Sequence, residues 1–376
     1  MPPSFGMVMG PWNDAADGRV GLERAAGEAG LDHVTVLAVS GPLVQWRLDE
    51  HSETPLFVTE GGWHFPPTAK LYAGVGLRPV RARWLGSGDP LEGLCRQAER
   101  LGLRVVVRVD GLAAGVLPES AQLGRRNAWG QELATAGACP CNPAVRELIR
   151  ATLDDLRRYG PADVELADDG PDHALPAPVG EALAWHPAAR AVGAVCFCPA
   201  CRQIAARAGV DPLSAARSAR VLLGQLAREP SSSATLRDDP VLGAYLAART
   251  ADHDAWLRRL ADADTQRRHL LVRPADAAEG RPTSLDVVLR WTAGTTGAPG
   301  GTAGPTIAGD LSDGHIVGWS VSAWRPVFGA AAELVRWAAE ATQRGATWFD
   351  FEGLDTAPPD AVTWLRQAVR YARRGA

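Results

Sequence analysis

The chain has 376 residues, of which 46% are hydrophobic and 22% charged, the balance of a globular protein with a sizeable core. Its formal net charge is −4, so the chain has no excess of basic residues, and we expect neither nucleic acid nor an anionic membrane as a partner. The sequence has no uninterrupted apolar run of about 18 residues and no basic stretch followed by an apolar run near its start, which predicts a cytoplasmic protein without membrane spans.

Short β-branched apolar runs alternate along the chain with longer segments rich in Ala, Leu and Arg, a pattern typical of βα units and a parallel sheet. Eight runs are predicted as strands: Phe5–Trp12, His33–Ser40, Arg104–Asp110, Ala162–Asp168, His269–Pro274, Leu285–Trp291, His315–Trp324 and Thr347–Gly353. Helical patterns cover Gly18–Gly30, Asp89–Leu101, Asn142–Tyr159, Pro212–Leu260 as two or three helices, Phe328–Arg344 and Pro359–Arg373. The alternation predicts an α/β fold, a (β/α)8 TIM barrel in one domain over residues 1–376, with an open doubly wound sheet as the alternative.

Three stretches are predicted as loops. Gln45–Val80 follows the second strand, and Gly170–Ala194 follows the fourth. Barrel enzymes place active-site residues in loops that follow the carboxyl ends of strands. Ala293–Asp310 is rich in Gly, Thr and Pro and stands where the sixth helix belongs, so we expect a degenerate sixth helix and a flexible loop over 293–310.

The run Cys196-Phe-Cys198-Pro-Ala-Cys201 is the strongest local signal. Three thiolates at this spacing can converge on one metal ion, and a structural zinc site needs a fourth ligand, usually Cys or His. Candidates for that ligand are Cys139, Cys141, His173 and His186. The pattern predicts a structural zinc in an inserted loop region over 170–210, with simple buried thiols as the alternative.

This cysteine pattern resembles the zinc site of the β-galactosidases of glycoside hydrolase family 42, in which an upstream cysteine joins C-x-C-x-x-C in the loop after the fourth strand. Four segments also resemble bacterial proteins described as family-10-like glycosyl hydrolases: Gly61–Pro67, Cys139–Pro143, Val164–Leu166 and Cys196–Arg202. The resemblance extends from about Trp63 to Val210. It implies a barrel that acts on a carbohydrate, with Cys139, Cys196, Cys198 and Cys201 as zinc ligands and Cys141 as a bystander.

Glycoside hydrolysis needs two carboxyl groups that flank the scissile bond. Carboxylates stand at or near three predicted strand ends: Asp110, Glu165, Asp168, Asp169, Asp350 and Glu352. We expect Asp168 or Asp169 as proton donor or base and Asp350 or Glu352 as the second carboxylate, while Asp110 and Arg325 position the substrate. Strand alternation places Glu165 on the face opposite Asp168, where a charge pointing into the barrel needs partners or a shifted pKa. Helix caps and solvated loop acids are the alternative for each of these residues.

Two departures from the family 42 pattern leave more than one function open. The Asn-Glu pair expected after strand four is replaced by Glu165-Leu-Ala-Asp-Asp, and strand seven ends Ser320-Val-Ser-Ala-Trp-Arg325, without a carboxylate. A hydrolase with divergent acids is the first hypothesis. A carbohydrate-binding barrel without catalysis is the second, and a zinc-dependent hydrolase is the third.

Tryptophan favours a carbohydrate ligand, since the chain has 13 Trp against 4 Tyr and 7 Phe. Flat indoles stack on the apolar faces of sugar rings, and their N–H groups donate to hydroxyls. The predicted ligand-binding residues in loops or at strand ends are Trp12, Trp63, His64, Trp129, Trp291 and Trp324. Ordinary packing is the alternative for each of them.

Overall fold

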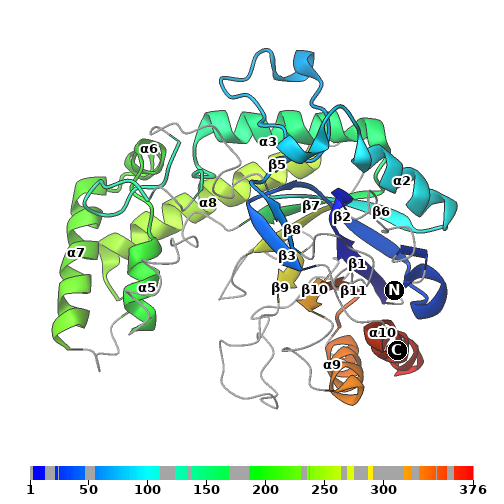
Figure 1. Cartoon of the computed structure of the whole chain (residues 1–376). Coiled ribbons are helices and arrows are strands. Elements are labelled where there is room, and N and C mark those ends of the chain that lie inside the picture. The colour runs from blue at the N-terminus through cyan, green and yellow to red at the C-terminus, as the bar shows by residue number, and fades with distance from the viewer. Residues whose placement is uncertain are drawn as a thin grey trace.

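A curled, parallel sheet forms the centre of the molecule (Figure 1). The computed structural model describes residues 3–12, 22–23, 25–46, 56–110, 123–133, 137–168, 186–229, 235–236, 238–263, 269–274, 287–290, 317–322, 330–343, 345–353 and 360–375. The parallel strands are β1 (Ser4–Met9), β2 (His33–Ser40), β6 (Arg104–Val109), β7 (Asp163–Asp168), β8 (His269–Pro274), β9 (Val287–Arg290), β10 (Val317–Ser322) and β11 (Trp348–Glu352). These strands match the predicted ones to within a few residues at each end.

The pairing of the strands shows how the sheet curls. Parallel neighbours follow the order β1–β2–β6–β7–β8–β9–β10–β11, and β11 pairs again with β1. The β8–β9 pairing consists of the single register pair Val272 and Val287. Each strand therefore has a parallel partner on both sides, and the carboxyl ends of all of them lie on the same side of the sheet.

Six described helices begin at a proline that follows a capping residue. They are α2 (Pro90–Arg100), α3 (Pro143–Leu156), α5 (Pro187–Ala194), α6 (Pro199–Arg207), α7 (Pro212–Arg228) and α8 (Pro240–Asp262). Asp89 accepts a hydrogen bond from the Glu92 amide, and Asn142 accepts one from the Ala144 amide, as the sequence predicts for these caps. Two further helices, α9 (Ala331–Gln343) and α10 (Asp360–Gly375), pack beside each other near the end of the chain.

Two predicted loops contain regular structure. Gln45–Val80 includes one strand of the antiparallel pair β3 (Leu43–Trp46) and β4 (Leu56–Thr59), and also β5 (Gly62–Trp63), which pairs with β2. Helix α5 occupies the end of Gly170–Ala194. The loop predictions missed these elements because the Gly and Pro content of the two stretches was given more weight than the β-branched residues of β4 and the proline that begins α5. Residues 170–185 lie outside the described residues. The predicted loop Ala293–Asp310 lies outside the described residues.

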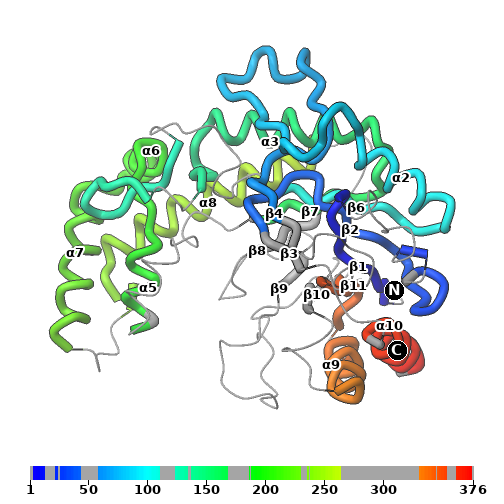
Figure 2. The backbone as a smooth tube through the Cα atoms, viewed as in Figure 1, coloured from blue at the N-terminus to red at the C-terminus, as the bar shows by residue number. Residues whose placement is uncertain are grey.

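The buried apolar residues form two cores. The larger core lies between the outward face of the strands and the helices around them, and includes Phe5, Val107 and Phe349. The second joins helices α5–α7 and the first half of α8 to Ala128, Cys139 and Cys141, and we call this assembly the cysteine lobe. Figure 2 shows α8 running from the lobe to the sheet. Its Leu242 and Tyr245 belong to the lobe core, whereas its Trp256, Leu257 and Leu260 belong to the sheet core.

The concave face of the sheet is polar. Arg108 on β6 reaches Glu352 on β11, although β2 and β1 lie between those two strands, so this contact crosses the interior of the curl. Deeper in the curl, His33 Nε2 and Thr35 Oγ1 of β2 meet Asp350 Oδ1 of β11 at 3.2 and 2.7 Å. Gly6 of the intervening β1 makes room for this contact, because a Cβ at that position would stand 2.1 Å from the His33 ring.

Asp350 is the most densely bonded acid of this interior. It is fully buried, and Trp348 Nε1 donates to its second oxygen at 2.9 Å. Burial raises the pKa of Asp350, but the hydrogen bond and charge of His33, the charge of Arg108 and the Thr35 hydroxyl outweigh burial and lower it. The carboxylate is therefore ionised, and its contribution to stability is present above the usual carboxyl pKa and is lost as the pH falls below about 4.

Replacing Asp350 should strongly destabilise the fold. We expect Asp350→Ala to lower the free energy of unfolding by about 3–5 kcal/mol, because His33, Thr35 and Trp348 lose their common acceptor inside the sheet. Urea unfolding followed by circular dichroism measures this change. Glu60→Gln is the control, since Glu60 forms an exposed ion pair with Arg83, and it should change stability by less than about 0.5 kcal/mol. Equal stabilities of the two variants would contradict this assignment.

Candidate functional site

An arginine bridges two acids at the carboxyl-end half of the curled sheet. Arg108 Nε lies 2.8 Å from Glu165 Oε1, and its Nη2 donates to Glu165 Oε2 at 3.0 Å. Its Nη1 donates to Glu352 Oε1 at 3.2 Å. Glu165 is fully buried, whereas 22% of the Glu352 side chain is exposed. The site thus holds two carboxylates and one guanidinium, and only Glu352 is open to solvent.

The charge state of this group follows from its burial. Burial lowers the pKa of Arg108, but the carboxylates of Glu165, Glu352 and Asp350 outweigh burial and raise it. Arg108 therefore remains a cation and favours the ionised form of both partner acids. A carboxylate held in this way is suited to act as a nucleophile or base, and unsuited to donate a proton.

The structure separates the predicted catalytic acids. Glu165 and Glu352 are brought together, while Asp350 lies one layer deeper on β11 among His33, Thr35 and Trp348. Asp350, which the sequence offers as a candidate for the second carboxylate, is fully buried, so we leave it out of the group that faces solvent. Asp168 is the last residue of β7, and Asp169 lies outside the described residues.

A second cluster follows the carboxyl ends of β1 and β2 and surrounds His64. Trp84 Nε1 donates to His64 Nδ1 at 3.3 Å, and His64 Nε2 lies 2.8 Å from Ser40 Oγ, which in turn donates to the Gly41 carbonyl at 3.1 Å. These bonds fit a neutral ring protonated at Nε2. Burial lowers the pKa of His64 to about 3. Trp12 packs edge-on against both His64 and Trp84.

Three of the predicted ligand-binding residues are buried in the interior of the protein. Trp12, Trp63 and His64 are 2%, 1% and 0% exposed, and Trp63 Nε1 donates to Thr152 of α3 at 3.1 Å. All three side chains are thus packed against other parts of the protein, although the sequence placed them in a loop or at a strand end. The Gly- and Pro-rich setting of Trp63 and His64 suggested an open loop, but the pairing of β5 with β2 draws this segment inward.

The other predicted binding residues have varied positions. Asp110 directly follows β6 and is half-buried, and its amide donates to the Val39 carbonyl at 2.9 Å. Trp129 is 54% exposed. Trp291, Trp324 and Arg325 lie outside the described residues.

Four of the six cysteines converge at one point. The sulfur atoms of Cys139, Cys196, Cys198 and Cys201 all lie within 4.8 Å of one another, and all four residues are buried. The Cys139 and Cys201 sulfurs are 3.5 Å apart, and the Cys139 and Cys196 sulfurs 3.9 Å. Four thiolates that each lie about 2.3 Å from one ion in a tetrahedron have sulfurs about 3.8 Å apart. The cluster, which contains no disulfide, could therefore hold a metal ion.

Helices α3 and α8 support this cluster. Tyr245 of α8 donates from its hydroxyl to the Cys196 carbonyl at 2.8 Å and stacks on Phe197. Cys141, the neighbouring buried thiol, is outside the group of four, and its pKa is lowered to about 4 by hydrogen bonds with Cys139 and Cys201 and by the charges of Arg249 and Arg146, against the effect of burial.

Sequence reasoning missed Arg108, Ser40, Trp84 and Tyr245 as members of these clusters. Only Arg108 gave a signal in the sequence, because it is a charged residue between valines within a strand. Tyr245 and Trp84 stand in ordinary helical or loop contexts far along the chain from their partners. No local pattern identifies such contacts.

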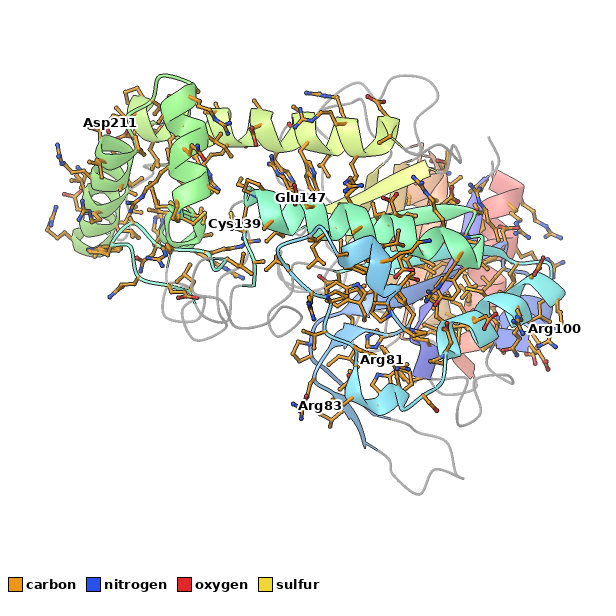
Figure 3. The ribbon with its side chains drawn as sticks, turned by 90° about the horizontal axis from the view of Figure 1, so that it is seen from above. Arg81, Arg83, Arg100, Cys139, Glu147 and Asp211 are labelled. Atoms are coloured by element: carbon orange, nitrogen blue, oxygen red, sulfur yellow. The ribbon has the colours of Figure 1, made fainter. Side chains whose placement is uncertain are left out.

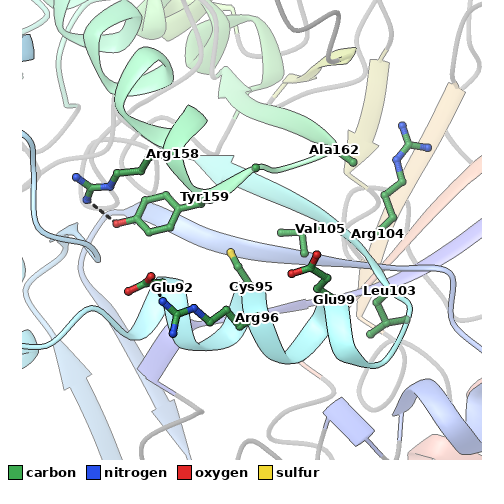
Figure 4. A pocket seen from close by; sticks show the side chains of 11 residues that line it. Glu92, Cys95, Arg96, Glu99, Leu103, Arg104, Val105, Arg158, Tyr159 and Ala162 are labelled. Atoms are coloured by element: carbon green, nitrogen blue, oxygen red, sulfur yellow. Dashed lines mark hydrogen bonds and ion pairs between the residues drawn. The ribbon is translucent and has the colours of Figure 1, made fainter.

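The molecule also has a pocket of about 440 Å³, which lies at the opposite end of the strands (Figure 4). Arg104, Val105 and Ala162 place it at the amino ends of β6 and β7. Its cations have protein partners, since Arg104 pairs with Asp163, and Arg158 donates to the Tyr159 hydroxyl. Figure 3 shows Arg100 on this side and Cys139 on the opposite side of the molecule. The cysteine cluster thus lies on the side toward which the strands run.

No family model matches the sequence, and no curated protein matches it. Solved structures show a similar fold. The chain is similar to the β-galactosidase from the psychrophilic Marinomonas ef1 (12% identity, TM-score 0.52), with 98% of this chain and 59% of that chain covered. It is also similar to the β-galactosidase from Bacillus circulans sp. alkalophilus (10% identity, TM-score 0.53), with 98% and 55% covered.

A third similar structure is the GH42 β-galactosidase Gan42B (10% identity, TM-score 0.52), with 99% of this chain and 57% of that chain covered. The chain thus spans between 55% and 59% of the length of these enzymes. At such identities the likeness concerns the fold alone, which resembles the fold of these β-galactosidases. Among the described helices, none combines the length and apolar character needed to cross a membrane.

The pH dependence of stability should report the neutral state of His64. Below pH 6.5 the unfolded chain binds a proton at this residue that the folded chain excludes until about pH 3, so stability falls as the pH falls through this window. We expect His64 to account for a loss of about 2 kcal/mol between pH 7 and pH 5. Urea unfolding of the wild type and of His64→Gln at both pH values measures this loss. The same change in the free energy of unfolding between pH 7 and pH 5 in both proteins would refute the assignment to His64.

The four-cysteine cluster should hold one metal ion per chain. We expect Cys139→Ser and Cys198→Ser to lose the metal and several kcal/mol of stability, since the ion's binding energy contributes to folding. Elemental analysis by mass spectrometry and thermal unfolding measure these losses. Cys141→Ser and Cys95→Ser are matched controls that should retain the metal. Loss of metal from the Cys141 variant would place that thiol among the ligands.

Proposed function

We propose that the chain is a single (β/α)8-barrel domain of glycoside-hydrolase type that acts on a carbohydrate. The ring of parallel pairings, in which β1 meets both β2 and β11, supports the barrel. The described helices and the cysteine lobe emerge from βα connections, as insertions do in this architecture. In this proposal residues 170–210 belong to a metal-binding insertion after the fourth barrel strand.

The bridge formed by Arg108 between Glu165 and Glu352 is the observation on which the proposed chemistry rests. Glu352 is partly exposed and accepts a hydrogen bond from Arg108, whose positive charge favours a carboxylate there, so we assign it the role of nucleophile or base. Glu165 is fully buried and positions Arg108. A proton donor is also required, and Asp168 or Asp169, at the end of β7, is assigned this role.

The substrate is held in this proposal by groups around the same end of the strands. Asp110, at the end of β6, accepts hydrogen bonds from sugar hydroxyls. Trp291, Trp324 and Arg325 follow β9 and β10 in the sequence and contribute stacking and polar contacts.

The metal of the cysteine cluster is assigned a structural role, with zinc as the ion. Four thiolates form the donor set that zinc prefers in structural sites, and the sulfur separations fit a tetrahedron. When bound, zinc would cross-link the loop before α3 to the start of α6. Four protein ligands fill the tetrahedral site, which disfavours the zinc-dependent hydrolase, because a catalytic zinc keeps a position for water.

A carbohydrate-binding barrel without turnover is the second candidate function. One observation favours it: β10, the seventh strand of the ring, reads Val-Gly-Trp-Ser-Val-Ser and carries no carboxylate. If the protein were a glycosidase, both of its reacting carboxyl groups would have to come from β7 and β11, because β10 supplies none.

Turnover of nitrophenyl glycosides, with β-galactoside first, tests the proposal. We expect Glu352→Gln to lower kcat at least about a thousandfold, because the reacting carboxylate is lost. The control is Glu60→Gln, which alters an exposed acid in the turn before β5 and should keep wild-type rates. Saturable sugar binding by calorimetry with no turnover of any glycoside would select the second candidate. Wild-type rates in Glu352→Gln would refute the assignment of that residue.

A further inference from the structure

Trp129 lies in the loop that precedes the cysteine cluster, and it is the most exposed of the described tryptophans. It stands in a tight turn between Arg126 and Glu132, which form an isolated antiparallel bridge, and 54% of its surface is exposed. Gly130 follows it with a φ of 80°, a left-handed conformation that favours glycine. The turn therefore displays a large apolar side chain instead of burying it.

Hydrogen bonds within the turn fix its shape. Asn127 Oδ1 accepts from the amides of both Trp129 and Gln131, each at 3.0 Å, and Asn127 Nδ2 donates to Gln131 Oε1 at 2.9 Å. The Gly130 amide donates to the Asn127 carbonyl at 2.9 Å. A side chain carried by such a turn loses little further freedom when it binds a ligand.

The turn is also fastened to the cysteine lobe. The Phe197 amide donates to the Arg126 carbonyl at 2.7 Å, between two of the clustered cysteines in sequence. The Cys139 amide donates to the Leu123 carbonyl at 3.0 Å, and Ala128, next to Trp129, is buried in the lobe core. The position of Trp129 thus depends on the segments that carry the thiol cluster.

The surroundings of Trp129 indicate what kind of ligand fits. Gln131 and Glu132 beside it are exposed and polar, and the amide of Asn127 and the guanidinium of Arg126 belong to the same turn. A single flat apolar face with a rim of amides and charges complements a pyranose ring, which has one apolar C–H face and hydroxyls at its edge. A protein partner would instead require a contiguous apolar patch.

We propose that the turn 126–132 is a carbohydrate-binding platform on the cysteine lobe, on which Trp129 stacks one ring of an oligosaccharide or polysaccharide. The platform belongs to the lobe and not to the strand ends that carry Glu352. It therefore binds an extended substrate outside the reacting site, and a metal ion held by the four clustered cysteines would keep it in position. The inference rests on the proposed carbohydrate ligand and not on turnover.

Native affinity electrophoresis in gels cast with β-1,4-galactan, xylan or hydroxyethyl cellulose tests the platform. We expect at least one polysaccharide to retard the wild type, with Trp129→Ala about tenfold weaker and Trp129→Phe between the two. Tyr371→Ala is the matched control, because Tyr371 is 55% exposed on α10, and it should be retarded like the wild type. No retardation of the wild type in any gel, or equal retardation of Trp129→Ala, would overturn the proposal.

Two further arms separate this inference from the proposed hydrolysis and test the metal's role. Glu352→Gln should be retarded like the wild type, since the platform does not use the reacting acid. Retardation that depends on Trp129 in a protein without turnover leaves the platform standing and refutes only the hydrolase. Chelation of the metal under reducing conditions should abolish retardation, and zinc should restore it; retardation that survives chelation would refute the dependence on the metal.

Discussion

The charges inside the curled sheet constrain the rest of the structure, because none of them can be buried without a partner. Arg108 compensates Glu165 and Glu352, and Asp350 accepts hydrogen bonds from His33 and Thr35 of β2 and from Trp348 of β11. These contacts run from β6 and β2 to β11, so they hold together strands that are not neighbours in the sheet. The charges that hold the curl together also leave one partly exposed carboxylate where the strands end. Architecture and the candidate chemistry thus share the same ion pairs.

The sequence predicted the repeating parts of this molecule well. Every predicted strand is present because β-branched runs bounded by polar residues report local preference, and the capped prolines before α2 and α3 mark helix starts in the same way. The thiol cluster was also predictable, since Cys196, Cys198 and Cys201 occupy one short segment. In each case the information lies within a few neighbouring residues.

Contacts between distant segments could not be predicted. The partners of Asp350 are set by which strands face each other across the interior, and strand alternation gives only the face of each residue. His64 and Trp63 appeared to lie in an open loop because of neighbouring glycines and prolines, yet pairing of β5 with β2 buries both. Sequence identified the residue types of the candidate site, while their exposure and charge state depended on the packing of the whole chain.

Helix α8 has a mechanical consequence for the molecule. Its first turns complete the core beneath the thiol cluster, and Trp256, Leu257 and Leu260 near its other end complete the core around the sheet. Because one continuous helix contributes to both cores, we expect a change that loosens the packing of the cysteine lobe also to weaken the packing around the sheet. Removing the lobe together with α8 would therefore also take Trp256, Leu257 and Leu260 out of the core around the sheet and expose the residues that they cover.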